Sequence, residues 1–487
     1  MDKFYITTPI YYATAKPHLG HAFATIYADT IARYQKIKGK EVFFSVGTDE
    51  HGTKVAKKAE EENKSPQKYV DEIFSLYRSV WQSLNINYTD FIRTTEIRHK
   101  KGVEKFIQKL INAQSIYKDQ YEGLYCVDCE KFLTERELIN GLCPDHLKPP
   151  QKISEENYFF NLEKYLPEVR RKIITNELKI TPEARRNETL SLIETGVSNF
   201  SITREKVSWG IKFPFDSRQT IYVWVEALMN YVTVLDFPEG ENYKKFWPAD
   251  LQVIGAEINK FHTIFWPAML LAINEPLPKE IFIHGLFTVN GQKMSKTLGN
   301  VIDPLILIEK FGADATRYLL VSQFPASEHG DIKEEQFVIK YNADLANGIG
   351  NLFERVLTMA KDMDDDYDDD YDYDNDDGYD NEIKDFQKKI EVIYANKMNN
   401  YQLYEALTAV FSFVKKLDQY INQKEPWQLI KNRNSEAKKV LKTLTFGIKN
   451  IIFWLKPFMP QKMEEAEEYL KNINKQSGKL NLFPRLK

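Results

Sequence analysis

The chain has 487 residues, 43% of them hydrophobic and 28% charged, with a net charge of −4 at pH 7, which predicts a soluble globular protein of about three domains. No apolar run reaches the roughly 18 residues of a membrane-spanning helix and the N-terminal segment MDKFYITTPI has no leader pattern, so we expect a cytoplasmic protein without a membrane partner. Only three cysteines occur, which excludes a disulfide scaffold.

The first third of the chain predicts alternating strands and helices. Residues 4–8 and 41–46 form apolar strands, and the helix between them begins near Gly20. Its apolar face consists of Phe23, Ile26, Tyr27, Ile31 and Tyr34. A strand–helix–strand unit implies a parallel sheet. Further strands are predicted at IYVWV (221–225), LQVIG (251–255) and IFIHG (281–285), so we expect one α/β sheet that an inserted domain interrupts.

A metal-binding spacing lies in the segment between the two sets of strands. It reads Cys126-x2-Cys129, thirteen intervening residues, and Cys143-x2-His146, and it contains every cysteine of the chain. Two such turns bring thiolate and imidazole ligands to one point, which suits tetrahedral Zn²⁺. Because four protein ligands leave no open position, we predict one structural zinc ion.

The pattern from about residue 335 onward predicts a helical bundle. One apolar stripe consists of Leu403, Leu407, Val410, Val414, Leu417 and Ile421, and another of Leu441, Leu444, Ile448, Ile451 and Leu455. Residues 362–382 carry a net charge of −13, which predicts a disordered surface insertion. Residues 383–487 carry +10, which fits either a polyanionic partner or an ordinary lysine-rich helical surface.

Two short motifs follow the predicted strands. Residues 17–21, PHLGH, lead into the first helix, whose N-terminus offers N–H groups and a positive dipole end to a phosphate. Residues 293–297, KMSKT, lie between two glycines, and their two lysines, one turn apart, could clamp a triphosphate and stabilise departing pyrophosphate. Taken singly, each motif also fits an ordinary surface segment.

Together the two motifs resemble the paired signatures of class I aminoacyl-tRNA synthetases, which form aminoacyl adenylates on a Rossmann-like fold. The stretches TTPIYYATAKPHLGH, GTDEHGTK, IYVWVEALMNY and FHTIFWPAML are similar to methionyl-tRNA synthetases, and so is the single zinc knuckle. The resemblance covers nearly the whole chain. It implies a Rossmann-like parallel-sheet catalytic domain interrupted by the zinc-binding insertion, followed by an all-α anticodon-binding bundle. The insert, of about 100 residues, is smaller than the editing domains of relatives that charge valine, isoleucine or leucine.

The resemblance also implies roles for individual residues. Those expected in catalysis are His18, Gly20, His21, Lys293, Met294, Ser295 and Lys296. Those expected to bind ATP are His18, His21, Glu257, His284, Lys293 and Lys296. Those expected to bind methionine are Ile10, Tyr12, Asp49, Trp224, Ala227, Leu228, Tyr231, Ile258 and His262, with Asp49 on the substrate ammonium. Those expected to bind the anticodon are Asn351, Arg355, Pro426 and Trp427. Ala256 and Glu257 depart from the Gly-Lys-Asp-Ile segment usual in the family.

Domains and partners follow from the same resemblance. The two halves of the catalytic domain are expected at 1–114 and 214–285, the insertion at 115–213, a signature-loop and stem-contact region at 286–340, and the bundle at 341–487. The expected partners are L-methionine, ATP with Mg²⁺, and initiator and elongator tRNA(Met). No oligonucleotide-binding domain follows the helical region, so a monomer is expected. The alternatives are a synthetase for another amino acid, a small nucleotidylyltransferase and a non-catalytic tRNA-binding paralogue.

Overall fold

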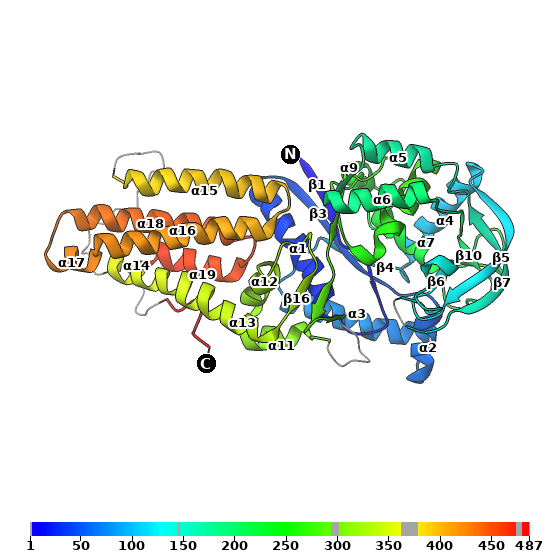
Figure 1. Cartoon of the computed structure of the whole chain (residues 1–487), viewed down its shortest axis with the longest axis horizontal. Coiled ribbons are helices and arrows are strands. Elements are labelled where there is room, and N and C mark those ends of the chain that lie inside the picture. The colour runs from blue at the N-terminus through cyan, green and yellow to red at the C-terminus, as the bar shows by residue number, and fades with distance from the viewer. Residues whose placement is uncertain (1, 145–146, 294–300, 362–377, 474–479, 487) are drawn as a thin grey trace. The chain divides into compact units, whose positions relative to one another are not determined.

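The computed structural model describes residues 2–144, 147–293, 301–361, 378–473 and 480–486 (Figure 1). The chain divides into two compact units. The first consists of Met1–Ala28, Gln35–Gln82 and Ile86–Leu286. The second consists of Asp29–Tyr34, Ser83–Asn85 and Phe287–Lys487. No helix in the described ranges combines the length and the apolar character that crossing a membrane requires.

A seven-stranded parallel sheet forms the centre of the first unit. Its order is β2-β3-β1-β12-β13-β8, with β4 paired to β3. The strands span Lys3–Thr7 (β1), Tyr11–Tyr12 (β2), Glu41–Asp49 (β3), Asp90–Arg93 (β4), Lys179–Thr181 (β8), Leu251–Gly255 (β12) and Glu280–His284 (β13). The central strands are almost wholly buried, as parallel strands covered on both faces must be. The strands predicted at 4–8, 41–46, 251–255 and 281–285 are confirmed, with small shifts at their ends.

Helices cover this sheet and follow its strands along the chain. They span Leu19–Ile37 (α1), Thr53–Glu61 (α2), Pro66–Ser83 (α3), Ile97–Asn112 (α4), Leu166–Ile174 (α5), Glu183–Thr195 (α6), Val223–Leu228 (α7), Asn230–Thr233 (α8), Glu241–Phe246 (α9) and Trp266–Ala272 (α10). Short 3₁₀ turns lie at Glu135–Glu137 (η1) and Ala256–Ile258 (η2), and a π-helical turn at Phe261–Phe265 (η3). The predicted first helix is α1, and all five residues of its expected apolar face are buried.

The strand predicted at 221–225 is wrong. Only Thr220–Ile221 (β11) is extended there, and it pairs antiparallel with Thr203–Arg204 (β10) outside the main sheet. Helix α7 starts directly after Tyr222, and all but one of its residues are buried. A short apolar run that is buried on several sides has the same pattern in a strand and in a core helix, so periodicity could not separate the two.

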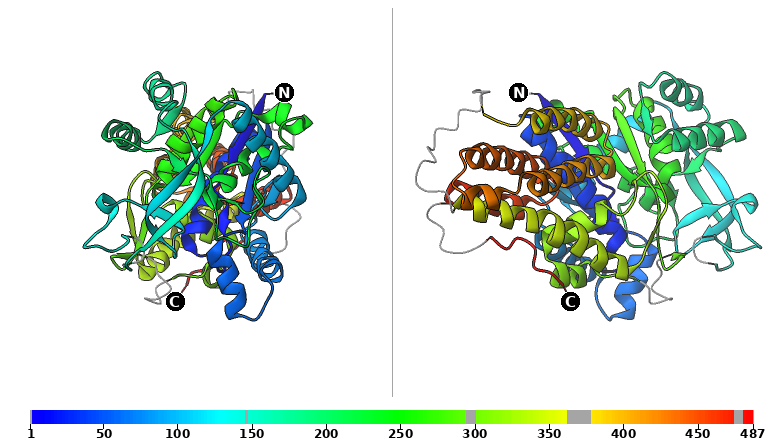
Figure 2. Two further views of the ribbon diagram at one scale, coloured as in Figure 1. Left: turned by 90° about the vertical axis from the view of Figure 1, so that its right-hand side faces the viewer. Right: turned by 60° about the vertical axis from the view of Figure 1, so that its left-hand side comes forward.

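The inserted segment builds its own antiparallel sheet, in the order β6-β5-β7-β9. Its strands span Ile116–Cys126 (β5), Lys131–Leu133 (β6), Gln151–Phe160 (β7) and Phe200–Ser201 (β9), and the long β5–β7 pair is visible in both views of Figure 2. Between β7 and β9 the chain supplies β8 to the edge of the main sheet. The sequence pattern missed this return because β8 has only three residues.

The second unit is mainly helical. Its strands Phe287–Val289 (β14), Gln292–Lys293 (β15) and Gly330–Ile332 (β16) form a small sheet. Its helices span Pro304–Phe311 (α11), Ala313–Val321 (α12), Glu334–Lys340 (α13), Asn351–Lys361 (α14), Asn381–Asn399 (α15), Leu403–Lys424 (α16), Pro426–Lys431 (α17), Glu436–Leu455 (α18) and Pro460–Lys471 (α19), with a π-helical segment at Tyr341–Gly350 (η4). Helices α15, α16 and α18 run side by side (Figures 1 and 2). Both predicted apolar stripes are buried.

The expected disorder does not extend to residue 382. Residues 362–377 lie outside the described ranges, but Tyr379 packs its ring on Phe446 with the centroids 4.6 Å apart. Asp380 then caps α15 by accepting a hydrogen bond from the backbone N–H of Glu382. An aromatic contact and an N-cap therefore order the end of the acidic stretch, in spite of its charge.

A buried ion pair holds the second unit together. Arg317 on α12 is fully buried, and its guanidinium lies 2.7 Å from the carboxylate of Asp29. The same guanidinium donates to the carbonyl oxygens of Pro457 and Phe458, at 3.1 and 3.0 Å. One cation thus joins α12 to the turn after α18 and to the part of α1 that belongs to this unit.

We predict that Arg317→Met lowers the free energy of unfolding by about 3 kcal/mol, because it leaves buried carbonyl oxygens without a donor. Lys340→Met is the control, since it removes an ion pair with Asp344 that is partly exposed on both sides and should cost no more than about 1 kcal/mol. Urea unfolding of the two variants measures both values. Equal losses would show that Arg317 has no special role.

Candidate active site

The motif HLGH forms a fixed pair of imidazoles at the start of α1. The backbone N–H of Gly20 donates to Nδ1 of His18 at 3.1 Å, and the N–H of His18 lies 3.3 Å from Nδ1 of His21. The two rings stack with their centroids 3.7 Å apart. Because each Nδ1 accepts a hydrogen bond, each ring carries its proton on Nε2, where it can donate to a phosphate oxygen.

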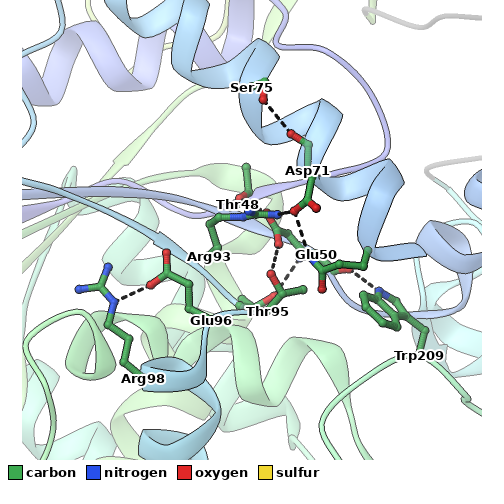
Figure 3. Close-up of polar contacts among 11 residues, drawn as sticks. Thr48, Glu50, Asp71, Ser75, Arg93, Thr95, Glu96, Arg98 and Trp209 are labelled. Carbon is green, nitrogen blue, oxygen red and sulfur yellow. Dashed lines mark hydrogen bonds and ion pairs between the residues drawn. The ribbon is translucent and has the colours of Figure 1, made fainter. Parts of the chain in front are cut away.

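A buried carboxylate fixes the turn that follows β3 (Figure 3). Glu50 is fully buried, and its Oε1 accepts hydrogen bonds from Thr48 Oγ1 and Arg93 Nε, both at 2.7 Å. Thr95 donates to the other oxygen, and the indole N–H of Trp209 donates to the Glu50 carbonyl at 2.6 Å. This carboxylate is therefore paired with a cation and hydrogen-bonded on both oxygens, which burial of a charge requires.

The preceding residue, Asp49, is different. Its carboxylate is buried, and its Oδ1 has no hydrogen-bond partner among the described residues. Burial raises the pKa of Asp49 well above its ordinary value, and the nearby carboxylates of Glu226 and Glu130 raise it further. The position therefore favours a cation, and an incoming ammonium group would both satisfy the oxygen and offset the negative charges.

Most of the residues expected to hold the methionine side chain belong to the core of the first unit. Tyr231, Leu228, Trp224, Tyr12, Ile10 and Ile258 all belong to, or pack against, the same hydrophobic cluster. Trp224 stacks on Phe261 with the centroids 4.3 Å apart. The hydroxyl of Tyr231 lies 2.7 Å from Nε2 of His262. Nδ1 of His262 lies 3.0 Å from the carbonyl oxygen of Ile258. Ala227 is buried as well.

His262 is uncharged in this wall. Burial lowers the pKa of His262 to about 4. Its Nδ1–H donates to the carbonyl of Ile258, so its Nε2 accepts the hydroxyl proton of Tyr231. The wall thus carries an aromatic, neutral and hydrogen-bonded surface, which suits a polarizable thioether better than a polar side chain.

Two of the predicted ATP ligands lie at the carboxyl ends of β12 and β13. His284 ends β13, and its Nδ1 donates to the carbonyl of Gly285 at 2.8 Å. Burial lowers the pKa of His284, and the carboxylate of Glu257 opposes that shift. A Cβ on Gly255 would lie 2.5 Å from Oε2 of Glu257, so the carboxylate of Glu257 lies close over this glycine. Carboxyl ends of parallel strands are the usual place for a nucleotide.

The three cysteines converge as their spacing predicts. The sulfur atoms of Cys126, Cys129 and Cys143 lie within 4.8 Å of one another, and those of Cys129 and Cys143 are 3.8 Å apart. Tetrahedral zinc with Zn–S distances of about 2.3 Å places its sulfurs about 3.8 Å apart, so the three thiols fit the ion. The fourth predicted ligand, His146, lies outside the described residues.

Two groups of predicted residues belong to the second unit. Lys293 ends β15, while Met294, Ser295 and Lys296 lie outside the described residues. In the bundle, the guanidinium of Arg355 lies 5.9 Å from the ring centroid of Trp427, which is 41% exposed. Asn351 is exposed at the start of α14, and Pro426 is the first residue of α17. The bundle therefore presents an accessible indole beside a cation.

Sequence reasoning missed Glu130, which links the cysteine cluster to α2 and to the residues before α7. Glu130, next to Cys129, is 2% exposed, and its Oε1 accepts the backbone N–H of Lys54 at 2.6 Å, in the first turn of α2. Its carbonyl accepts the hydroxyl of Tyr222, while the carbonyl of Cys129 accepts the indole N–H of Trp224 at 3.3 Å. A glutamate next to a cysteine is expected to be exposed, so no sequence pattern would have indicated the burial of Glu130 or its contacts.

The chain matches the sequence model of a family described as tRNA synthetases class I (M) over residues 4–152 and 147–357, and an anticodon-binding domain of tRNA ligase over residues 381–485. It is 40% identical over 473 residues to the methionine–tRNA ligase of Clostridium acetobutylicum, covering 96% of this chain and 73% of that protein. It is also 40% identical over 470 residues to the methionine–tRNA ligase of Thermotoga maritima, covering 95% of this chain and 74% of that protein. The chain belongs to the class I methionyl-tRNA synthetases.

A solved structure agrees with this membership. Mycobacterium tuberculosis methionyl-tRNA synthetase in complex with methionyl-adenylate matches this fold with a TM-score of 0.91 and 30% identity, over 100% of both chains. The reaction of methionyl-tRNA synthetases, ATP-dependent ligation of methionine to tRNA, is therefore the reaction of this chain. The predicted Rossmann-like fold and the predicted activity are confirmed, and the alternative activities are not supported.

The buried neutral His262 makes stability depend on pH. Its pKa is about 4 in the folded chain and about 6.5 in the unfolded chain, so between these values the unfolded chain binds more protons and stability falls as the pH falls. We predict that lowering the pH from 7 to 5 costs the wild type about 2 kcal/mol more than it costs His262→Gln. Urea unfolding at both pH values measures this. Parallel losses in the two proteins would contradict the prediction.

Proposed function

We propose that the described residues share the two steps of the methionine–tRNA ligase reaction as follows. In the first step a carboxylate oxygen of methionine attacks the α-phosphorus of ATP, and pyrophosphate leaves. In the second step the terminal adenosine 2′-hydroxyl of tRNA attacks the carbonyl carbon of methionyl-adenylate, and AMP leaves. No protein nucleophile is needed, so the chain acts by positioning and by stabilising charge.

The methionine end of the site rests on Asp49. Its buried Oδ1, which has no hydrogen-bond partner in the part of the chain that the structure describes, supports binding of the substrate ammonium, and this is the observation that carries the proposal. The neutral wall of Tyr231 and His262 and the ring of Trp224 support an apolar thioether in the pocket. Ile10, Tyr12, Ala227, Leu228 and Ile258 complete the proposed pocket.

The nucleotide end uses the two signatures. The Nε2–H groups of His18 and His21 would donate to phosphate oxygens beside the N-terminus of α1, with Gly20 leaving room for the nucleotide. Lys293 and Lys296, with Met294 and Ser295 between them, would stabilise the departing pyrophosphate. Class I synthetases need Mg²⁺ with ATP, and the ion would neutralise phosphate charge. Glu257 and His284 would contact the nucleoside.

The remaining proposals concern partners and assembly. Arg355 beside the accessible ring of Trp427, with Asn351 and Pro426, supports binding of unstacked anticodon bases. The tRNA partners would be both initiator and elongator tRNA(Met). We also propose that the chain acts as a monomer in the cytoplasm, with domain boundaries as the sequence predicts, and that one zinc ion is held by the three cysteines and His146.

We predict that ATP–pyrophosphate exchange across the twenty amino acids occurs with methionine alone. Lys296→Ala should lower this exchange at least 100-fold, because it removes charge from the leaving group, and should leave methionine binding nearly unchanged. Lys57→Ala, an exposed lysine on α2, is the control and should exchange at the wild-type rate. Exchange with another amino acid would overturn the pocket assignment, and an unchanged rate in Lys296→Ala would overturn the role of the loop.

We predict that Cys143→Ser lowers the metal content from one zinc per chain to less than half and lowers the melting temperature, because the fully buried Cys143 is a proposed ligand in the insert. Elemental analysis and a thermal melt measure the two effects. Ser191→Ala, at an exposed position on α6, is the control and should keep its zinc. Full zinc content in Cys143→Ser would rule out this ligand set.

A further inference from the structure

A chain of buried hydrogen bonds lies behind the methionine pocket and is not used by any step above. Glu226 on α7 has no exposed surface. Its Oε1 lies 2.7 Å from Nδ1 of His51, and its Oε2 lies 2.7 Å from Nε2 of His99 on α4. His99 is itself fully buried, and its Nδ1 lies 2.7 Å from the hydroxyl of Thr233 at the end of α8.

The donors and acceptors of this hydrogen-bond network fit an ionised Glu226. Burial alone would raise the pKa of Glu226, but His51 and His99 hold it below its ordinary value, so the carboxylate is ionised and only accepts. His51 then carries its proton on Nδ1 and His99 on Nε2. The hydroxyl of Thr233 lies 2.7 Å from the remaining Nδ1 of His99, to which it can donate, and 3.4 Å from the carbonyl of Asn230. Each of these buried atoms therefore has a partner of the right kind, which makes the network rigid.

The anchors of the network come from two elements of the sheet domain. His51 lies two residues after Asp49, in the turn that follows β3. His99 lies on α4, which approaches α8 so closely that a Cβ on Gly102 would be 2.5 Å from a methyl carbon of Thr233. Glu226 thus ties the α7–α8 segment to the turn after β3 on one side and to α4 on the other.

The segment that is tied in this way carries four of the proposed methionine-binding residues. Trp224, Ala227 and Leu228 share α7 with Glu226, and Tyr231 lies on α8 beside Thr233. Helices α7 and α8 have only six and four residues, so their own hydrogen bonds position them weakly. The spacing between this wall and Asp49 therefore depends on contacts made by side chains.

We propose that Glu226 is a positioning residue for methionine: through His51 and His99 it sets the distance between the side-chain wall on α7–α8 and the ammonium site at Asp49, without touching the substrate. The proposal rests on the proposed function of that pocket. Its consequence is that losing Glu226 weakens methionine binding selectively, because the nucleotide end at α1, β12 and β13 has none of these contacts.

The test measures pyrophosphate exchange while methionine and ATP are varied separately. Glu226→Ala removes both contacts, and its KM for methionine should rise at least tenfold while its KM for ATP stays within twofold. Glu226→Gln keeps the shape and can still bridge the two imidazoles after one of them changes tautomer, so its KM for methionine should rise less than threefold. This recovery by the conservative variant separates a positioning role from a merely structural one.

The controls make each failure recognisable. Asp314→Asn alters another buried carboxylate, which accepts the backbone N–H of Lys462 in the second unit, and should lower the melting temperature without changing either KM. Thr233→Val replaces Glu226→Ala if that variant does not fold, and its KM for methionine should rise two- to fivefold with an unchanged KM for ATP. Asp49→Asn should raise the KM for methionine.

Three outcomes would overturn the inference. The first is a KM for methionine within twofold of wild type in Glu226→Ala, or in Thr233→Val where that variant stands in. The second is an equal rise of both KM values, which would indicate general loosening of the domain. The third is a rise in Glu226→Gln as large as in Glu226→Ala. If Asp49→Asn also leaves the KM unchanged, the pocket assignment itself fails; if Asp49→Asn raises it, only the role of Glu226 fails.

Discussion

Buried negative charge after β3 is the constraint on which this site depends. A carboxylate removed from water needs a cation or several hydrogen-bond donors. Glu50 has Arg93 and two hydroxyl groups, and Glu226 has two imidazoles. Asp49 keeps one oxygen without a partner among the described residues, although Glu226 and Glu130 both raise its pKa. The fold thus satisfies two of these carboxylates itself, and the open oxygen of Asp49 is what supports the proposed contact with the substrate ammonium.

The zinc knuckle matters to the pocket because of what its backbone touches. The residue after the second cysteine, Glu130, caps the first turn of α2, and the knuckle carbonyls accept hydrogen bonds from Tyr222 and Trp224. Trp224 therefore has one face on Phe261, and its N–H donates to the carbonyl of Cys129, one of the three clustered cysteines. These hydrogen bonds connect the insert to residues outside it, on α2 and at the start of α7. The cysteine cluster is therefore hydrogen-bonded directly to Tyr222 and to Trp224, one of the residues proposed to bind methionine.

The sequence allowed the sheet, the bundle and the cysteine cluster to be predicted, because each produces a local pattern. Buried parallel strands give apolar runs such as 251–255, and the x2 turns bring Cys126 and Cys129 together. The same rule failed at 221–225, where a buried helix gives an equally apolar run. Glu226 directly follows that run, and both Glu226 and His51 lie in stretches that resemble the family, yet neither received a role. Glu226 is 175 residues from His51 and 127 residues from His99 along the chain, so only the fold could bring the three together.

Glu257 illustrates how a departure from the family pattern can keep its chemistry. The family usually has aspartate where this chain has a longer side chain, preceded by Ala256 in place of lysine. In the structure the carboxylate of Glu257 folds back over Gly255, at the carboxyl end of β12, and its charge acts on His284 at the end of β13. Because the longer side chain of Glu257 bends back towards the backbone of Gly255, its carboxylate stays at the carboxyl ends of the strands. A nucleoside usually binds at such strand ends. The missing lysine has no such replacement within this short segment.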